Sequence, residues 1–264
     1  MLLNSIFFFS ILVLLGLLIF YFFQEKFIFR NGYTLPKNAP FHFSVPFDEV
    51  FLTTSDQQEI HAVHLRLPNA RGVVLFFHGN KGNLTKWGER VNYFLSDSYE
   101  VFVIDYRGYG KSTGNFNEAQ MYEDALLAYS HLKKSFSEDK IVVYGFSLGS
   151  TFATKVAALN SPKELILEAP FYNLKKAVQF AFPLAPTFLL KFKFNTNHAI
   201  PLVASPITVF HGTHDKTTSF EEAKILLRLN TSSENAFIPI PEGTHHNIRT
   251  FPSYKQKLTA LLER

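Results

Sequence analysis

Apolar runs of strand length alternate with longer amphipathic segments from residue 72 to residue 262, and this alternation restricts the possible folds more than any other feature. Residues 72–78 form an unbroken run that suits a strand buried on both faces of a parallel sheet. Further strands are expected at residues 101–105, 141–145, 164–168, 207–211 and 236–240. Helices are expected at residues 87–95, 118–134, 148–159, 220–229 and 254–262. This order predicts an α/β fold with a mostly parallel central sheet and helices on both faces.

Two other segments stand apart from this alternation. Residues 49–53 and 59–67 alternate polar and apolar side chains around a Ser-Asp turn, which predicts a hairpin. Residues 171–201 are rich in Phe and Pro and fall between two expected strands. This stretch is either a short lid insertion that lines an acyl pocket or an ordinary crossover helix with a proline-kinked entrance.

The N-terminus has the length and composition of a membrane span. No charged side chain interrupts residues 2–23, and at about 1.5 Å per residue such a helix crosses a hydrocarbon core of about 30 Å. A cleaved signal peptide would have basic residues before the apolar run and small residues after it, whereas bulky Phe22 and Phe23 end this one. Lys26, Arg30 and Lys37 follow the span, so the positive-inside rule places the rest of the chain in the cytoplasm.

These features predict one anchored domain. Residues 1–24 would form a single-pass transmembrane anchor and residues 25–46 a linker rich in Pro, Asn and Gly. Residues 47–264 would form one catalytic domain with residues 171–201 as its possible lid, since the roughly 230 residues that follow the first thirty suit one sizeable α/β domain.

Composition excludes several classes of site. The absence of cysteine excludes disulfides, a thiolate zinc site and a cysteine nucleophile. The net charge of +4 suits either an anionic membrane surface or an ordinary solvated face. No basic run interleaved with aromatics suggests nucleic acid, and no glycine-rich phosphate loop follows the first strand. Ten histidines occur without a carboxylate pair at ligand spacing, so neither a metal nor an organic cofactor is expected, and oligomeric state is not indicated.

The motif that bears on chemistry is Gly-Phe-Ser-Leu-Gly at residues 145–149. An expected strand precedes it and an expected helix follows it. Small residues at both ends allow a sharp turn that exposes the hydroxyl of Ser147, which predicts a nucleophile. The alternative is a glycine-rich turn with an incidental serine.

A serine nucleophile needs a base and an orienting carboxylate, here expected in the order Ser, Asp, His. Asp215 lies just past the end of the expected strand 207–211, and His245 lies just past the expected strand 236–240. Two choices stay open at this point. His246 competes with His245 as base, and Glu242 and Glu168 compete with Asp215 as the acid.

Acyl transfer also needs donors for the oxyanion. The backbone N–H of Leu148 is one candidate, because it follows the nucleophile directly. The other is the backbone N–H of Asn80, in the glycine-rich loop after the strand that ends at His78. We expect the side chain of His78 to hold this loop by hydrogen bonds. We expect Asp105 to organise the loop after the strand at residues 101–105, with Arg107 as its partner.

Five motifs in order along the chain carry a family resemblance. They are F-H-G-N-K-G-N at 77–83, D-Y-R-G-Y-G-K-S at 105–112, G-F-S-L-G at 145–149, H-G-T-H-D at 211–215 and P-E-G-T-H at 241–245. With them the chain resembles the α/β-hydrolase superfamily, and more narrowly the membrane-anchored abhydrolase-domain proteins.

This resemblance implies the α/β-hydrolase fold and a role for each motif. Carried over by position, Ser147 is the nucleophile, Asp215 the acid and His245 the base, with Asn80 and Leu148 in the oxyanion hole. Two positions depart from the usual pattern: Lys81 stands where a small residue is more common, and His246 where Asn is more common.

The expected activity is hydrolysis of a carboxylic ester or thioester of an apolar, lipid-like acyl group through a Ser-His-Asp triad, without metal or cofactor. A serine peptidase of the aminopeptidase kind is one alternative, and it would need an acidic group such as Glu242 or Glu168 to hold the substrate amine. A catalytically silent, membrane-tethered binding module is the other.

Overall fold

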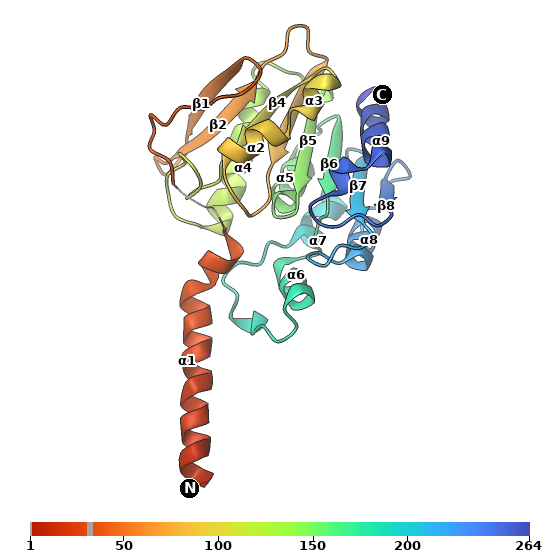
Figure 1. Ribbon diagram of the computed structural model, residues 1–264. Helices are drawn as coiled ribbons and strands as arrows, with labels where there is room; N and C mark the ends of the chain where they lie inside the picture. Colours follow the sequence, from red (N-terminus) through yellow and green to blue (C-terminus); the bar gives the residue numbers. More distant parts are fainter. Residues whose placement is uncertain (1, 31–33) are drawn as a thin grey trace.

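An eight-stranded sheet forms the centre of the globular part (Figure 1). The computed structural model describes residues 2–30 and 34–264. The strands lie in the order β1-β2-β4-β3-β5-β6-β7-β8; β2 is antiparallel to both β1 and β4, and the remaining pairs are parallel. The strands are β1 (Phe47–Thr53), β2 (Glu59–Leu65), β3 (Gly72–Phe77), β4 (Tyr99–Ile104), β5 (Ile141–Phe146), β6 (Glu164–Glu168), β7 (Ile207–Gly212) and β8 (Ala236–Ile240).

Helices cover both faces of the sheet. Alternate residues of β3 show why: Val73 and Leu75 belong to a core cluster that includes residues of α4, α5 and α8, whereas Val74 and Phe76 belong to a second cluster that includes residues of α2, α3 and α9. A strand buried on both faces in this way reads as a continuous apolar run. The helices are α1 (Leu2–Ile28), α2 (Leu84–Arg90), α3 (Tyr93–Ser96), α4 (Glu118–Leu132), α5 (Gly149–Leu159), α6 (Leu174–Ala181), α7 (Thr196–Ala199), α8 (Phe220–Arg228) and α9 (Pro252–Leu262). Short 3₁₀ turns are η1 (Glu138–Lys140), η2 (Thr187–Leu189), η3 (Ile200–Leu202) and η4 (Ile248–Thr250).

The predicted hairpin and parallel sheet are confirmed, but the helix predicted at residues 87–95 is wrong. Two short helices replace it. Asn83 begins α2, where its side chain accepts a hydrogen bond from the backbone N–H of Thr85 at 3.1 Å. At the other end the backbone N–H of Val91 donates to the carbonyl of Glu89, and the helix ends there, before Asn92. The amphipathic pattern continued through this break because both helices bury side chains against the same face of the sheet.

Residues 171–201 form a cap rather than a single crossover helix. They contain α6, η2, α7 and irregular chain, and they leave β6 at its carboxyl end and return to β7. Parallel strands place their carboxyl ends at one edge of the sheet, so the cap begins at the edge where β5 ends in the serine turn.

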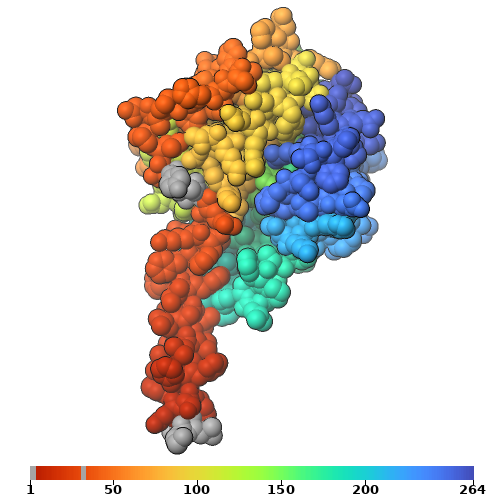
Figure 2. Space-filling view, viewed as in Figure 1, coloured from red at the N-terminus to blue at the C-terminus, as the bar shows by residue number. Residues whose placement is uncertain are grey.

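Helix α1 projects from the body as a long rod, and its N-terminal part stands free of it (Figure 2). Its apolar side chains are largely exposed; Phe7 and Phe9, for example, lie 68% and 67% in the open. Among the described residues, this helix alone is long and apolar enough to cross a bilayer. Its C-terminal end is attached to the body, where Phe29 is buried and stacks on Phe116 with ring centroids 4.1 Å apart.

Stability is expected to fall in mild acid because of a buried histidine in β2. Burial is the main cause that lowers the pKa of His64 to about 4, while its Nε2 lies 2.8 Å from Glu100. The unfolded chain binds that proton near pH 6.5, so the free energy of unfolding falls as the pH drops from about 6.5 to 4. Thermal unfolding of the detergent-solubilised chain across this range measures the effect. His64→Gln should flatten the dependence, and His42→Gln, at an exposed position, should not. Equal slopes for the two variants would contradict this prediction.

Candidate active site

The chain makes a strained turn at Ser147, between β5 and α5. Ser147 has φ +51°, a left-handed conformation that costs a residue with a Cβ about 1–3 kcal/mol. The glycines on either side have no room for a side chain. A Cβ on Gly149 would strike the carbonyl of Phe77, and one on Gly145 would come within 2.7 Å of Ala153. The sheet and α5 therefore hold the turn, and the strain presents the serine hydroxyl at the strand end.

The three residues predicted as a triad lie in one hydrogen-bonded path. The Oγ of Ser147 is 3.0 Å from Nε2 of His245, and Nδ1 of His245 is 2.7 Å from Oδ2 of Asp215. The carboxylate favours the tautomer with a proton on Nδ1, which leaves Nε2 free to accept the serine hydroxyl proton. All three residues are nearly buried, with exposed fractions of 8%, 6% and 6% in the same order.

The carboxylate of Asp215 is held by its own loop. Its Oδ1 accepts the backbone N–H groups of Thr217 and Thr218 at 2.7 and 3.0 Å, and its Oδ2 accepts the hydroxyl of Thr218 at 3.0 Å. Burial raises the pKa of Asp215, but the hydrogen bond and charge of His245 and the Thr218 N–H together keep it below its usual value. Sequence reasoning did not single out Thr218. Its signal was an aspartate followed by threonines two and three residues on, the pattern of an Asx turn.

The side chains of the alternative base and of the alternative acids lie outside the hydrogen-bonded path of the triad. His246 is exposed, with its ring centroid 4.9 Å from that of His245 and turned 79° from it. Glu242 is exposed at a turn. Glu168 is buried at the end of β6, where Nε of Arg249 donates to it at 2.7 Å and Tyr144 donates a further hydrogen bond. Within residues 2–30 and 34–264, no three His, Asp or Glu side chains gather as metal ligands do.

Arg249→Met is expected to destabilise the fold by about 3–5 kcal/mol, because it leaves the charge of Glu168 buried without its partner. The guanidinium also stacks 4.9 Å above the ring of Phe146, directly beside the serine turn. Chemical unfolding in detergent measures the loss. The matched control is Lys224→Met, which removes a cation from the exposed carboxylate of Glu221 and should cost no more than about 1 kcal/mol. A loss of similar size in both variants would contradict the prediction.

The loop after β3, predicted to supply an oxyanion donor, is held on several sides. His78 is buried, with Nδ1 2.6 Å from the carbonyl of Gly79 and Nε2 3.3 Å from Oδ1 of Asp105. The side-chain amide of Asn80 donates to the carbonyl of Ile28 at 2.8 Å, so the end of α1 is part of this support. Tyr109 donates to the carbonyl of Asn80 at 2.9 Å. Leu148 is the N-cap residue of α5, where backbone N–H groups lack partners within the helix.

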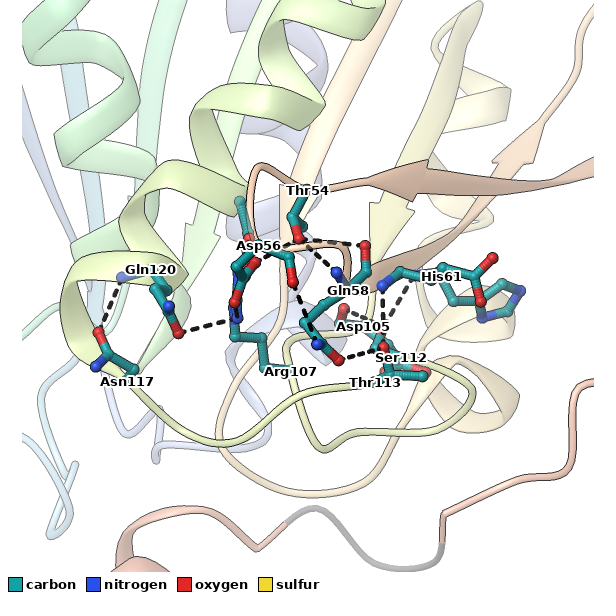
Figure 3. A network of polar contacts seen from close by, with 12 residues as sticks. Thr54, Asp56, Gln58, His61, Asp105, Arg107, Ser112, Thr113, Asn117 and Gln120 are labelled. Atoms are coloured by element: carbon teal, nitrogen blue, oxygen red, sulfur yellow. Dashed lines mark hydrogen bonds and ion pairs between the residues drawn. The ribbon is translucent and has the colours of Figure 1, made fainter.

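The expected pairing of Asp105 with Arg107 is wrong. Arg107 points away and donates to Asp56 and Asp124, at 2.5–2.9 Å, and to Gln120 at 3.0 Å (Figure 3). Asp105 instead accepts the backbone N–H of Leu84 at 3.2 Å. Both residues lie in the loop after β4, where the regular alternation of a strand no longer sets side-chain direction, so nearness in sequence did not predict the partner.

Proteins of similar sequence include α/β-hydrolase domain proteins of eukaryotes. The chain is 30% identical to the α/β hydrolase domain-containing protein aho-3 of Caenorhabditis elegans over 75% of its length, and spans 59% of that protein. It is 28% identical to protein bem46 of Schizosaccharomyces pombe, covering 85% of this chain and 79% of that one. It is also 28% identical to human α/β hydrolase domain-containing protein 17B, covering 80% and 73%.

Solved structures and a family pattern agree with the fold. An esterase from Pyrococcus furiosus superposes with a TM-score of 0.71 at 20% identity, over 88% of this chain and 99% of the esterase. A thioesterase domain from the curacin biosynthetic pathway superposes with a TM-score of 0.60 at 15% identity, over 83% and 100%. Residues 68–202, just over half of the chain, match the family described as serine aminopeptidase, S33. The chain therefore belongs to this family and has the α/β-hydrolase fold.

Proposed function

We propose that this chain is a membrane-anchored serine hydrolase that cleaves carboxylic ester or thioester bonds of apolar acyl substrates. The observation that carries the proposal is the path from Ser147 through His245 to Asp215, with distances of 3.0 and 2.7 Å. Such a path is the arrangement by which a weak hydroxyl nucleophile is activated.

Each residue has one task in this reaction. Nε2 of His245 takes the hydroxyl proton as Oγ of Ser147 attacks the acyl carbon, and then passes it to the leaving alkoxide or thiolate. Asp215 keeps the imidazole in the required tautomer and stabilises its positive charge. Water then attacks the acyl-enzyme, His245 takes a proton from that water, and the proton returns to Ser147 as the acid product leaves.

The oxyanion of both tetrahedral intermediates would accept hydrogen bonds from the backbone N–H groups of Leu148 and Asn80. Leu148 follows the nucleophile at the start of α5, where the helix dipole also favours negative charge. Asn80 lies in the loop that His78 and Tyr109 brace. The carbonyl of Ile28, at the end of α1, accepts a hydrogen bond from the side-chain amide of Asn80. Experiments on this site should therefore use the whole chain.

The preference for an apolar acyl group rests on the cap. Its Phe171, Phe192 and Phe194 are buried in the same apolar cluster as Leu148, the residue that follows Ser147. An aminopeptidase would need a free carboxylate for the substrate amine, and Glu168 is already bonded to Arg249. Aminoacyl amides therefore belong in the substrate panel as the competing class.

The membrane part of the proposal rests on α1. The most apolar 18-residue stretch of the helix at residues 4–28 has a mean hydropathy of 2.8, and a retained anchor suits the contacts at the end of the helix. Lys26, Arg30 and Lys37 follow the span, and by the positive-inside rule these basic residues favour the cytoplasmic side for the domain. Protease treatment of intact cells should leave the domain intact, and cleavage there would contradict this orientation.

The experiment is a chain-length series of nitrophenyl esters and thioesters, with aminoacyl amides, on the full chain in detergent. We expect hydrolysis to be faster for octanoyl than for acetyl esters. A strict preference for acetyl would overturn the apolar acyl group, and cleavage of amides alone would favour the peptidase. Absence of any hydrolysis and of fluorophosphonate labelling in a folded sample would favour a catalytically silent binding module.

A further inference from the structure

We propose that the tip of the cap, residues 182–188, inserts into the surface of the same bilayer that α1 spans. Three apolar side chains of this tip are exposed on the described protein: Phe182 at 69%, Leu184 at 99% and Phe188 at 77%. Such a cluster marks an interaction surface, and its position relative to α1 identifies the partner as lipid. The inference rests on the membrane span proposed above and adds a second, separate membrane contact.

The cap is bonded to α1 at one level along the helix. The side chain of Gln24 is fully buried, its Nε2 donates to the carbonyl of Leu189 at 3.1 Å, and its Oε1 accepts the backbone N–H of Lys191 at 2.7 Å. A buried side chain of a helix that makes two hydrogen bonds to the backbone of a loop fixes that loop to the helix. The cap is therefore not free to swing away from α1.

This level coincides with the boundary of the hydrocarbon core. Gln24 is the first strongly polar residue after the apolar run 2–23, and those 22 residues cover about 33 Å as a helix. A core about 30 Å thick consequently ends close to Gln24. Tyr21 lies one turn deeper, and the ammonium of Lys191 sits 4.7 Å from the centre of its ring. A tyrosine and a lysine together are typical of the membrane interface.

The exposed tip lies on the bilayer side of this level. In Figure 1 the cap descends beside the last turns of α1, and η2 contacts the helix. Phe182, Leu184 and Phe188 directly precede the bonded residues 189–191. Apolar side chains at this depth would enter the region between headgroups and acyl chains, as in proteins that lie in one leaflet.

Charge around the tip fits an anionic surface. Residues 171–201 contain four lysines and no acidic residue. Of these, Lys176 is bonded to Glu222, while Lys175, Lys191 and Lys193 are exposed. Basic residues beside inserted apolar ones are the pattern that binds anionic lipid headgroups.

One functional consequence follows from the topology. The cap begins at the carboxyl end of β6, the sheet edge at which β5 delivers Ser147. A cap seated in the bilayer would turn this edge toward the membrane, so an acyl substrate would reach the serine from the lipid phase.

The test uses nitroxide labels on the full chain, which has no cysteine of its own. Leu184→Cys, Leu14→Cys and Leu159→Cys are labelled separately and reconstituted in phosphatidylcholine–phosphatidylglycerol vesicles. Leu14 reports on the proposed span. Leu159 is the matched control, an exposed leucine at the end of α5 opposite the serine turn. Power saturation with oxygen, which concentrates in lipid, and with a water-soluble nickel chelate measures the surroundings of each label.

We expect oxygen to relax the labels at 14 and 184 more than nickel does, and the reverse at 159. Nickel dominating at 184 with oxygen dominating at 14 would overturn the cap insertion while leaving the span intact. Nickel dominating at both would overturn the span and the inference with it. Protection of 184 from both reagents would indicate a protein contact, such as a second copy of this chain, and would also overturn it. Unfolding curves equal to that of the unsubstituted chain establish that the three variants are folded.

Discussion

Ser147→Ala is expected to lower kcat on the best ester by about 10⁶-fold, the loss typical of removing the nucleophile of such a triad. The residual rate over water would come from oxyanion stabilisation and binding alone. KM should change little, because the serine hydroxyl contributes to the transition state rather than to ground-state binding. The measurement is steady-state hydrolysis by the full chain, together with fluorophosphonate labelling, which the variant should lose completely.

The control for this substitution is Ser135→Ala, at an exposed position after α4. It should retain both hydrolysis and labelling. Because Ser147 has φ +51°, alanine there keeps the same backbone strain, so the unfolding curve of Ser147→Ala should stay close to that of the original chain. A variant that keeps its activity, or that still labels, would contradict the assignment of Ser147 as nucleophile.

The adjacent histidines give the second large effect. His245→Ala is expected to lower kcat by about 10⁶-fold, since the serine hydroxyl then lacks its base. His246→Ala is expected to retain most of the activity, because His246 is exposed and its neighbour makes the contacts with Ser147 and Asp215. The two variants are closely matched, because each removes one imidazole from the same loop.

Combining variants makes this prediction sharper. If Ser147 and His245 act as one unit, the double alanine variant should lose no more activity than either single variant. Additive losses would contradict a shared path. Loss of activity in His246→Ala, with His245→Ala active, would assign the base to the other ring.

Much of the fold was predictable because it rests on local patterns. The continuous apolar run of β3 suits a strand buried on both faces, and the alternation of strands and helices then fixes a mostly parallel sheet. Asn117 begins α4 as a side-chain cap, a signal contained in a few consecutive residues. The break between α2 and α3 was missed because Val91 and Asn92 interrupt the backbone without interrupting the apolar pattern.

The sequence also placed Ser147, Asp215 and His245 at strand ends, in an order that the parallel sheet brings to one edge. It left His245 and His246 as alternatives, because both follow the same strand and only the direction of the side chain distinguishes them. Direction is set by the turn after β8, where Asn247 accepts the backbone N–H of Thr244 at 2.7 Å.

What tertiary structure alone decided are the partners that lie far apart in the chain. Arg107 pairs with Asp56 rather than Asp105, and Glu168 pairs with Arg249. Asn80 is held by Ile28, and Gln24 by residues of the cap. A sequence pattern describes which faces of each element are buried, whereas such pairs depend on how complete elements pack and on which donor and acceptor then meet. The sequence by itself therefore determined the sheet and the residues at its active edge, and packing determined which side chains join there and how the anchor is attached to the cap.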